Sequence, residues 1–140
     1  MKKYITKNLL IHAFVLAISS FLFRVFISWA LSNEYFTGVW FIAALYCLSV
    51  YLLIWKFSVL DKKILPIYDL GFRFHLVTYI VWVVISYLWF SFGNISSHEN
   101  MNQVHISSLY WLLTLIVHFC IYLFSRRKTI KGLKKTEIFD

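Results

Sequence analysis

Four long runs of apolar residues fill most of this chain, and short polar segments separate them. The runs cover Leu9–Leu31, Phe36–Leu60, Leu70–Phe92 and His105–Ser125. Each run is long enough to cross a bilayer, because a spanning helix needs about 20 mostly apolar residues. The pattern therefore predicts an all-α integral membrane protein with four transmembrane helices, arranged as two antiparallel hairpins.

Composition supports this class and argues against enzyme activity. Of the 140 residues, 61% are hydrophobic and 21% are aromatic, whereas an ordinary soluble domain is about 45–50% apolar. Four spans leave only short tails and connections outside the bilayer, so a soluble catalytic domain does not fit. The sequence also contains no convincing catalytic triad and no Gly-rich phosphate loop. We predict that the protein is not an enzyme.

The basic residues lie on one side of the predicted bilayer. All but one of the 14 Lys and Arg residues flank the first run, the connection between the second and third runs, or the end of the fourth. By the positive-inside rule, both termini are cytoplasmic. This topology accounts for the net charge of +8, and we predict no nucleic-acid partner.

The segment after the fourth run carries six basic residues. They are Arg126, Arg127, Lys128, Lys131, Lys134 and Lys135. Each basic residue near an anionic leaflet contributes about 1 kcal/mol of attraction. We expect this basic cytoplasmic tail, residues 128–140, to contact anionic lipid; an acidic cytoplasmic protein partner is the alternative.

The two predicted hairpins are similar to one another, which indicates a tandem duplication. A shift of 63 residues places His12 on His75, and a shift of 71 places Trp40 on Trp111. The predicted units are therefore residues 1–63 and 64–127. Both copies begin in the cytoplasm, so the repeat is parallel, unlike the inverted repeats of many secondary transporters.

The second hairpin carries several residues in a recognisable order. Its first helix opens with Gly71-Phe-Arg-Phe-His75-Leu-Val-Thr-Tyr79, Gly93-Asn94 follows in the loop, and Trp111 and Leu115-Ile-Val-His118 mark its second helix. Over residues 70–137 it resembles the bacterial two-transmembrane-helix (2TM) domain family. The loop is longer than is typical of the family, and the usual Asn residues are missing from the first helix. Cys47 stands where the first hairpin would have the counterpart of His118.

The resemblance implies a multi-pass module of the bacterial cytoplasmic (inner) membrane with a sensory or signalling role, and it implies no reaction. Members of this family occur alone or attached to signalling proteins.

Polar and aromatic residues recur every seven positions in the third run, a spacing typical of helices that pack with a left-handed crossing. The two interleaved sets are His75, Trp82 and Trp89, and Tyr79, Ser86 and Gly93. The fourth run has a matching set, which is Ser107, Trp111, Thr114, His118 and Ser125. Antiparallel pairing of these sets predicts that His75 lies level with Tyr122 and His118 level with Tyr79, near the inner leaflet.

Two interpretations of these residues remain open. In the first, the His and Tyr side chains hydrogen-bond neighbouring helices, at about 0.6–2 kcal/mol per contact. In the second, the histidines bind a ligand or carry protons, because ionisable residues inside a membrane commonly mark functional sites. We predict no metal site and no cofactor. A haem b held between His75 and His118, or between one of them and His12, is the alternative.

Arg24 is the only charged residue well inside a run. Its long side chain could snorkel to the outer headgroups; otherwise it needs a partner such as Glu34, a helix carbonyl or an anionic ligand. An unpaired arginine facing lipid costs at least about 2.5–3.5 kcal/mol. His98 and His105 flank the second outward loop, with Glu99 between them. We expect a solvated loop here, including Glu99; a metal site formed by these residues is the alternative.

These observations predict a small, non-enzymatic membrane protein that acts through self- or partner association, as a membrane sensor or signalling module. Its expected partners are the lipid bilayer and either a second copy of the chain or a cytoplasmic protein. A haem- or metal-binding protein that uses the helix histidines is one alternative. The other is an oligomeric small-solute or ion transporter or channel in which Arg24 lines the path.

Overall fold

The computed structural model describes residues 5–62, 67–93 and 95–132, which form four α-helices and, within these ranges, no strand. The helices are α1 (Lys7–Ser32), α2 (Phe36–Asp61), α3 (Ile67–Ser91) and α4 (Met101–Gly132). All four are long and apolar enough to cross a membrane. The prediction of an all-helical protein with four potential spans is therefore confirmed.

The fourth helix is longer than the hydrophobic pattern predicted. It begins at Met101 instead of His105 because Asn100 provides a cap: its side-chain oxygen accepts the backbone N–H of Asn102 at 2.9 Å. It also continues past the apolar span, which ends at Ser125, as far as Gly132.

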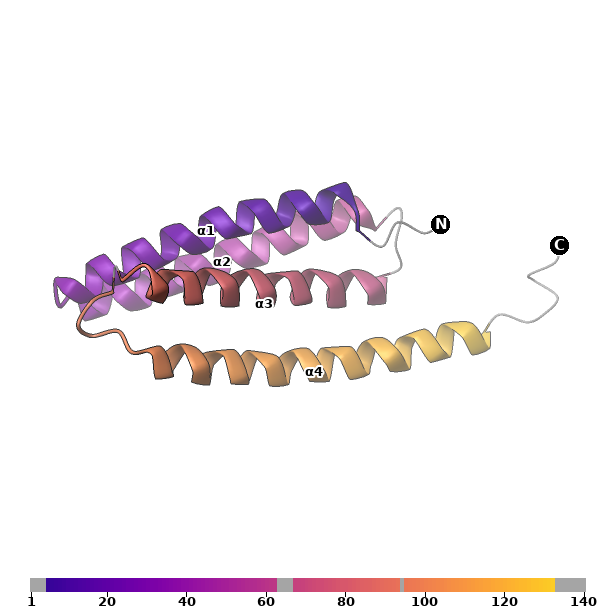
Figure 1. The fold of residues 1–140 in the computed structure, drawn as a ribbon. Helices are drawn as coiled ribbons and strands as arrows, with labels where there is room; N and C mark the ends of the chain where they lie inside the picture. The colour runs from indigo at the N-terminus through magenta and orange to yellow at the C-terminus, as the bar shows by residue number, and fades with distance from the viewer. Residues whose placement is uncertain (1–4, 63–66, 94, 133–140) are drawn as a thin grey trace.

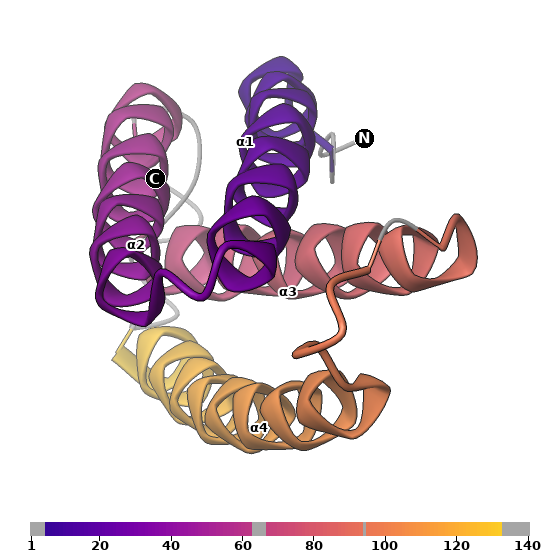
Figure 2. The same ribbon diagram turned by 90° about the vertical axis from the view of Figure 1, so that its left-hand side faces the viewer.

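Helix α3 is the central element of the bundle. Successive helices run in opposite directions along one long axis (Figure 1). Helices α1, α2 and α4 all pack against α3, and among the described residues α4 packs against no other helix. Figure 2 shows α4 on the side of α3 away from α1 and α2. One helix thus joins a compact α1–α2 pair to a peripheral α4.

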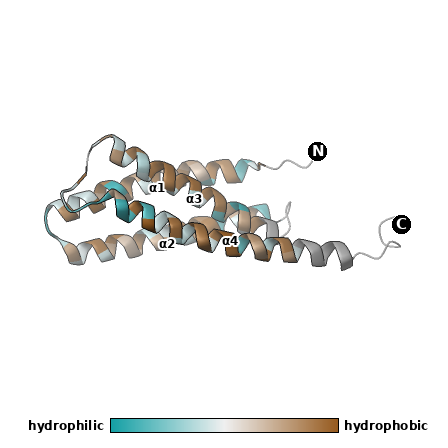
Figure 3. Ribbon diagram, turned by 60° about the horizontal axis from the view of Figure 1, so that its bottom comes forward, coloured by the Kyte–Doolittle hydropathy of each residue, from teal (hydrophilic) through white to brown (hydrophobic). Residues whose placement is uncertain are grey.

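Apolar side chains cover the outside of all four helices (Figure 3). Trp40, for example, is 80% exposed, and Phe14 and Phe124 are also on the surface. Hydrophilic residues gather in the connection between α3 and α4 (Figure 3). An apolar surface of this extent is unfavourable in water and favourable in a bilayer, where helices satisfy their own backbone hydrogen bonds.

Helices α1 and α3 meet along buried stripes with four-residue spacing. The stripe of α1 consists of His12, Leu16, Ser20, Arg24 and Ser28, and that of α3 consists of Leu70, Phe74, Thr78, Trp82 and Ser86. Ridges of this spacing on both helices interdigitate when the helices cross at an angle, commonly about 50°. Figure 2 shows that α1 and α3 cross instead of running parallel.

This crossing corrects the predicted seven-residue seam of α3. His75 does face α4, but Ser86 and Trp89 face α1, where they contact Arg24 and Ser28. The seven-residue spacing suits two helices that stay in contact over their full length. Helix α3 instead divides its polar positions between two neighbours.

A buried carboxylate holds α2 to the start of α1. Asp61, the last residue of α2, accepts hydrogen bonds from the Thr6 hydroxyl and from Asn8 Nδ2, the latter at 2.6 Å. Thr6 in turn caps α1 by accepting the backbone N–H of Leu9. The negative charge of Asp61 also complements the partial positive charge at the helix N-terminus. The buried charge is thereby satisfied.

The α1–α3 stripe predicts a position-dependent effect of removing a leucine side chain. Leu16 has no exposed surface, whereas Leu10 on the same helix is 60% exposed. Leu16→Ala should lower the free energy of unfolding by about 2 kcal/mol, since it leaves a cavity between packed helices. Thermal unfolding in a mild non-ionic detergent measures this. Leu10→Ala is the control and should be close to neutral; equal losses in the two variants would contradict the packing.

Candidate functional site: two polar clusters on either side of α3

The first cluster lies between α3 and α4 and contains two of the predicted site residues. His75 Nδ1 lies 2.9 Å from His118 Nδ1, and Trp111 Nε1 donates to His75 Nε2 at 2.8 Å. Both histidines are half-buried. Because both ring nitrogens of His75 are occupied, the predicted pairing of His75 with Tyr122 is wrong. Tyr122 instead stacks on Phe72, with ring centroids 5.3 Å apart.

The pairing shifts by about one helical turn for two physical reasons. Helix α4 continues beyond the start of α3 (Figure 1), so the start of the third apolar run and the end of the fourth are not level. In addition, Gly71 lets His118 approach the α3 backbone: a Cβ atom at Gly71 would lie only 3.2 Å from His118 Nε2. His118 therefore lies level with His75. The sequence shows that residue 71 is a glycine, but it does not show that His118 packs against it.

The Trp111 contact determines where the protons of the cluster lie. An indole N–H can only donate, so His75 Nε2 must be an unprotonated acceptor. A neutral His75 then carries its proton on Nδ1 and donates it to His118 Nδ1. His118 in turn carries its proton on Nε2. The three side chains form a hydrogen-bond chain with one direction, from Trp111 through His75 to His118.

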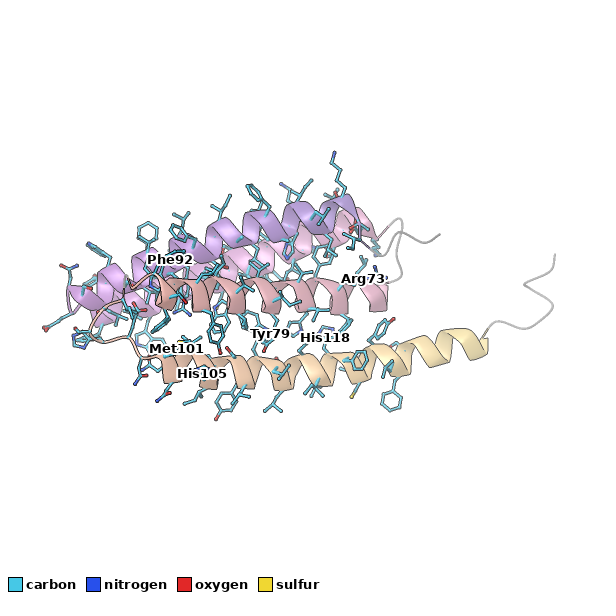
Figure 4. All side chains as sticks on the ribbon, in the orientation of Figure 1. Arg73, Tyr79, Phe92, Met101, His105 and His118 are labelled. Carbon is cyan, nitrogen blue, oxygen red and sulfur yellow. The ribbon has the colours of Figure 1, made fainter. Side chains whose placement is uncertain are left out.

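Aromatic rings surround this chain. Tyr79 and Trp82 both contact Trp111, with ring centroids 6.2 and 5.3 Å away. Figure 4 shows Tyr79 and His118 in the space between α3 and α4. Tyr79, one of the predicted site residues, therefore lies beside the cluster and contributes packing to it.

The arrangement does not fit a metal ion or a haem iron between the two histidines. A tetrahedral metal at about 2.0–2.1 Å from each imidazole nitrogen holds the nitrogens about 3.3 Å apart or more, whereas His75 and His118 are 2.9 Å apart in hydrogen-bond contact. Among the described residues, no group of three or more His, Cys, Asp or Glu side chains could hold a metal ion. The contacts of His75 with His118 and Trp111 are therefore hydrogen bonds and not metal coordination.

His12 belongs to a different interface, between α1 and α3. It is fully buried, its Nε2 lies 3.3 Å from Thr78 Oγ1, and its ring packs edge-on against Phe57 and Phe74. Its Nδ1 atom has no hydrogen-bond partner among the described residues. The structure thus brings His75 and His118 together and places His12 in a separate contact.

Arg24 is the centre of the second cluster, on the α1 side of α3. The residue is only 9% exposed, Nη2 donates to Ser86 Oγ at 2.6 Å, and the guanidinium lies 5.6 Å from the centre of the Trp82 ring. It is also within electrostatic reach of Glu99. The snorkelling interpretation is therefore wrong, because the side chain turns into the helix interface instead of toward the headgroups. Glu34, the carboxylate we considered as its partner, is exposed.

Glu99 joins the same cluster from the connection between α3 and α4. Its Oε1 accepts the hydroxyl proton of Ser28, and Ser28 Oγ accepts the indole N–H of Trp89 at 3.0 Å. The expectation that Glu99 is solvated is wrong. Its two neighbours do stay near the surface: His98 lies against the Phe36 ring and His105 hydrogen-bonds Tyr87 at 2.8 Å.

Several members of these clusters were missed at the sequence level. Ser20 bonds Tyr46 of α2 at 2.8 Å, and Ser28, Ser86 and Glu99 surround Arg24. The available signal was the four-residue spacing of polar residues in α1, from His12 through Ser20 and Arg24 to Ser28. Glu99 had no comparable signal, because its approach depends on how the connection folds.

The predicted lipid- or partner-binding residues of the tail lie outside these clusters. Arg126, Arg127, Lys128 and Lys131 belong to the last turns of α4, and their side chains, together with Lys134 and Lys135, are outside the described residues.

Comparison with known proteins adds no assignment: no family model, no curated protein and no solved structure matches the chain. The function must therefore be argued from the contacts of the chain itself.

The hydrogen-bond chain predicts the tautomers of two histidines. In protein labelled with ¹⁵N-histidine, the side-chain nitrogen shifts should show His75 protonated on Nδ1 and His118 on Nε2. Trp111→Phe removes the indole donor, so His75 should populate the Nε2–H form. Trp89→Phe is the control, because it removes an indole donor that serves Ser28. A wild-type His75 that carries its proton on Nε2 would refute the chain.

Proposed function

We propose that the protein is a non-enzymatic membrane module that acts by association, with α4 as the helix that meets the partner. A second copy of this chain is the first candidate partner. The observation that carries the proposal is that, among the described residues, α4 packs against α3 alone and leaves one polar flank uncovered.

The polar flank consists of Ser107, Thr114 and His118. Ser107 and Thr114 are exposed, and His118 is half-buried. The three are spaced by seven and four residues, the spacing that keeps one stripe of a helix against a partner with a left-handed crossing. Small polar residues are enriched where membrane helices meet, because they permit close approach and interhelical hydrogen bonds. The flank therefore has the character of a helix–helix interface.

An unused donor strengthens this argument. The hydrogen-bond chain places a proton on His118 Nε2, and among the described residues no acceptor bonds it. A polar N–H group exposed to hydrocarbon is unfavourable, and intramembrane histidines usually face protein or water. His118 Nε2 itself points to α3 near Gly71, so a helix packed along this flank would cover the half-buried ring and exclude lipid from it.

The proposal includes the topology and the signalling role. Both termini and the α2–α3 connection face the cytoplasm of a bacterial cell, and the two 2TM-like hairpins are related by duplication. In support, α1 begins and α4 ends at the same end of the bundle (Figure 1). In the sequence, 13 of the 14 basic residues lie near the start of α1, near the α2–α3 connection or near the end of α4. Helix α4 passes from the apolar span into the basic segment without a break. A change in α4 packing would thus reach anionic lipid or a cytoplasmic protein.

Association through this flank predicts position-specific cross-linking. Thr114→Cys places a thiol on the polar flank, and Ile116→Cys places one at nearly the same depth on another exposed face of α4. Both are made in a background in which the two native cysteines, Cys47 and Cys120, are replaced by Ser. Oxidation in native membranes should yield a covalent dimer for Thr114→Cys and at most a trace for Ile116→Cys.

Two outcomes would contradict a second copy at this flank. Equal dimer yields at both positions would indicate random collision, and no dimer at either position would exclude self-association through α4.

The proposed topology predicts the behaviour of reporter fusions. Green fluorescent protein attached after Asp140 should fluoresce, because it folds in the cytoplasm and not after export through the general secretion route. Alkaline phosphatase joined after Gly93 should be active, since that connection faces outward in the proposed topology. The reverse pair of results would show that the chain is inserted the other way.

A further inference from the structure

The end of the bundle where α1 and α3 finish contains a polar site closed by the chain's own loop. Helix α3 ends at Ser91, and α4 begins at Met101. The connection between Phe92 and Met101 turns back over this end of the molecule (Figure 4). Ser96 of the connection is buried, and Glu99 reaches Ser28 of α1. The loop thus inserts one carboxylate into the helix interface.

The hydroxyl and indole groups around this carboxylate have fixed directions. Ser86 donates its proton to the Trp82 carbonyl at 2.7 Å, so its oxygen accepts from Arg24. Ser28 accepts from the Trp89 indole, so its own proton points to Glu99. The hydroxyl of Ser28 therefore donates to Glu99, and the positive charge of Arg24 lies within electrostatic reach of the same carboxylate.

The carboxylate and the guanidinium each have an unused buried atom. Arg24 Nε and Glu99 Oε2 have no hydrogen-bond partner among the described residues. Arg24 is itself more than nine-tenths buried. A guanidinium binds a carboxylate best through two parallel hydrogen bonds, and the tether of Glu99 to the loop does not provide this geometry. The cluster therefore holds a positive charge suited to a carboxylate, and the carboxylate present leaves one buried atom on each side without a hydrogen bond.

We propose that Arg24, Ser28 and Trp89 form a binding site for a small monocarboxylate, in which Glu99 acts as a tethered occupant. The site lies near the end of the bundle that faces outward in the proposed topology. A free carboxylate of the size of acetate enters when Glu99 is withdrawn. Its oxygens then accept from Arg24 and from the Ser28 hydroxyl, while Trp82 covers the guanidinium.

Chemical rescue of a variant without the tethered group tests this site. Glu99→Ala removes the carboxylate and leaves Arg24 buried without a counter-charge, so the melting temperature should fall by about 4 °C or more. Sodium acetate at 100 mM should restore most of this loss, and sodium chloride at the same concentration should not. Thermal unfolding is followed in a non-ionic detergent at neutral pH. Wild-type protein should respond little, because Glu99 already occupies the site.

Two further variants show whether acetate acts at Arg24. Arg24→Gln combined with Glu99→Ala removes both charges, so it should remain folded and should not respond to acetate. Glu34→Ala removes an exposed carboxylate from the other loop at this end and should change neither the melting temperature nor the response to acetate. Acetate stabilisation that equals that of chloride, or that persists without Arg24, would overturn the proposal.

A Glu99→Ala protein that does not fold in chloride would still be informative. If the site is as proposed, solubilisation and purification in acetate should recover folded protein, and the recovery should require Arg24. Failure to recover folded protein in acetate, when the double variant folds in either salt, would overturn the proposal.

Discussion

The structure depends on the way in which one buried guanidinium is satisfied. Arg24 lies within a potential membrane span, where a charge without partners costs several kcal/mol. Its partners come from two segments: Ser86 and the Trp82 ring from α3, and Glu99 from the connection that follows. These contacts require α1 and α3 to cross along their four-residue stripes. The same crossing places α3 at the centre of the bundle and directs the long connection over its end.

Helix α3 consequently has two unlike faces. Toward α1 it presents a closely packed interface in which Phe74, Thr78 and Ser86 are almost fully buried. Toward α4 it presents the His75 cluster, which is only half-buried. One face of α3 is thus closely packed, and the other is incompletely covered. The proposed association and the proposed carboxylate site lie on opposite sides of this helix.

The two clusters also differ in what they can respond to. The Arg24 cluster is charged and is closed by a loop at one end of the bundle, and the proposed ligand there is a small anion. The His75 cluster is neutral in the hydrogen-bond arrangement described above and lies toward the opposite end, beside the flank of α4 where association is proposed. Because both clusters contact Trp82, whose ring meets Arg24 on one side and Trp111 on the other, a physical connection between them exists.

The sequence by itself determined the helical class and the number of potential spans, because runs of more than 20 apolar residues have one stable structure in lipid. It also identified His75, His118 and Arg24 as candidate site residues, since a polar or charged side chain within a membrane span is energetically costly. Their partners could not be predicted from it. Spacing within one helix does not specify the crossing with the next. His75 was therefore paired with Tyr122 instead of His118, and for Arg24 neither of the alternatives, the headgroups or a partner such as Glu34, named Ser86 and Glu99. Only the tertiary structure decided these pairings, because they depend on helix crossing, on the close approach at Gly71 and on the path of a loop.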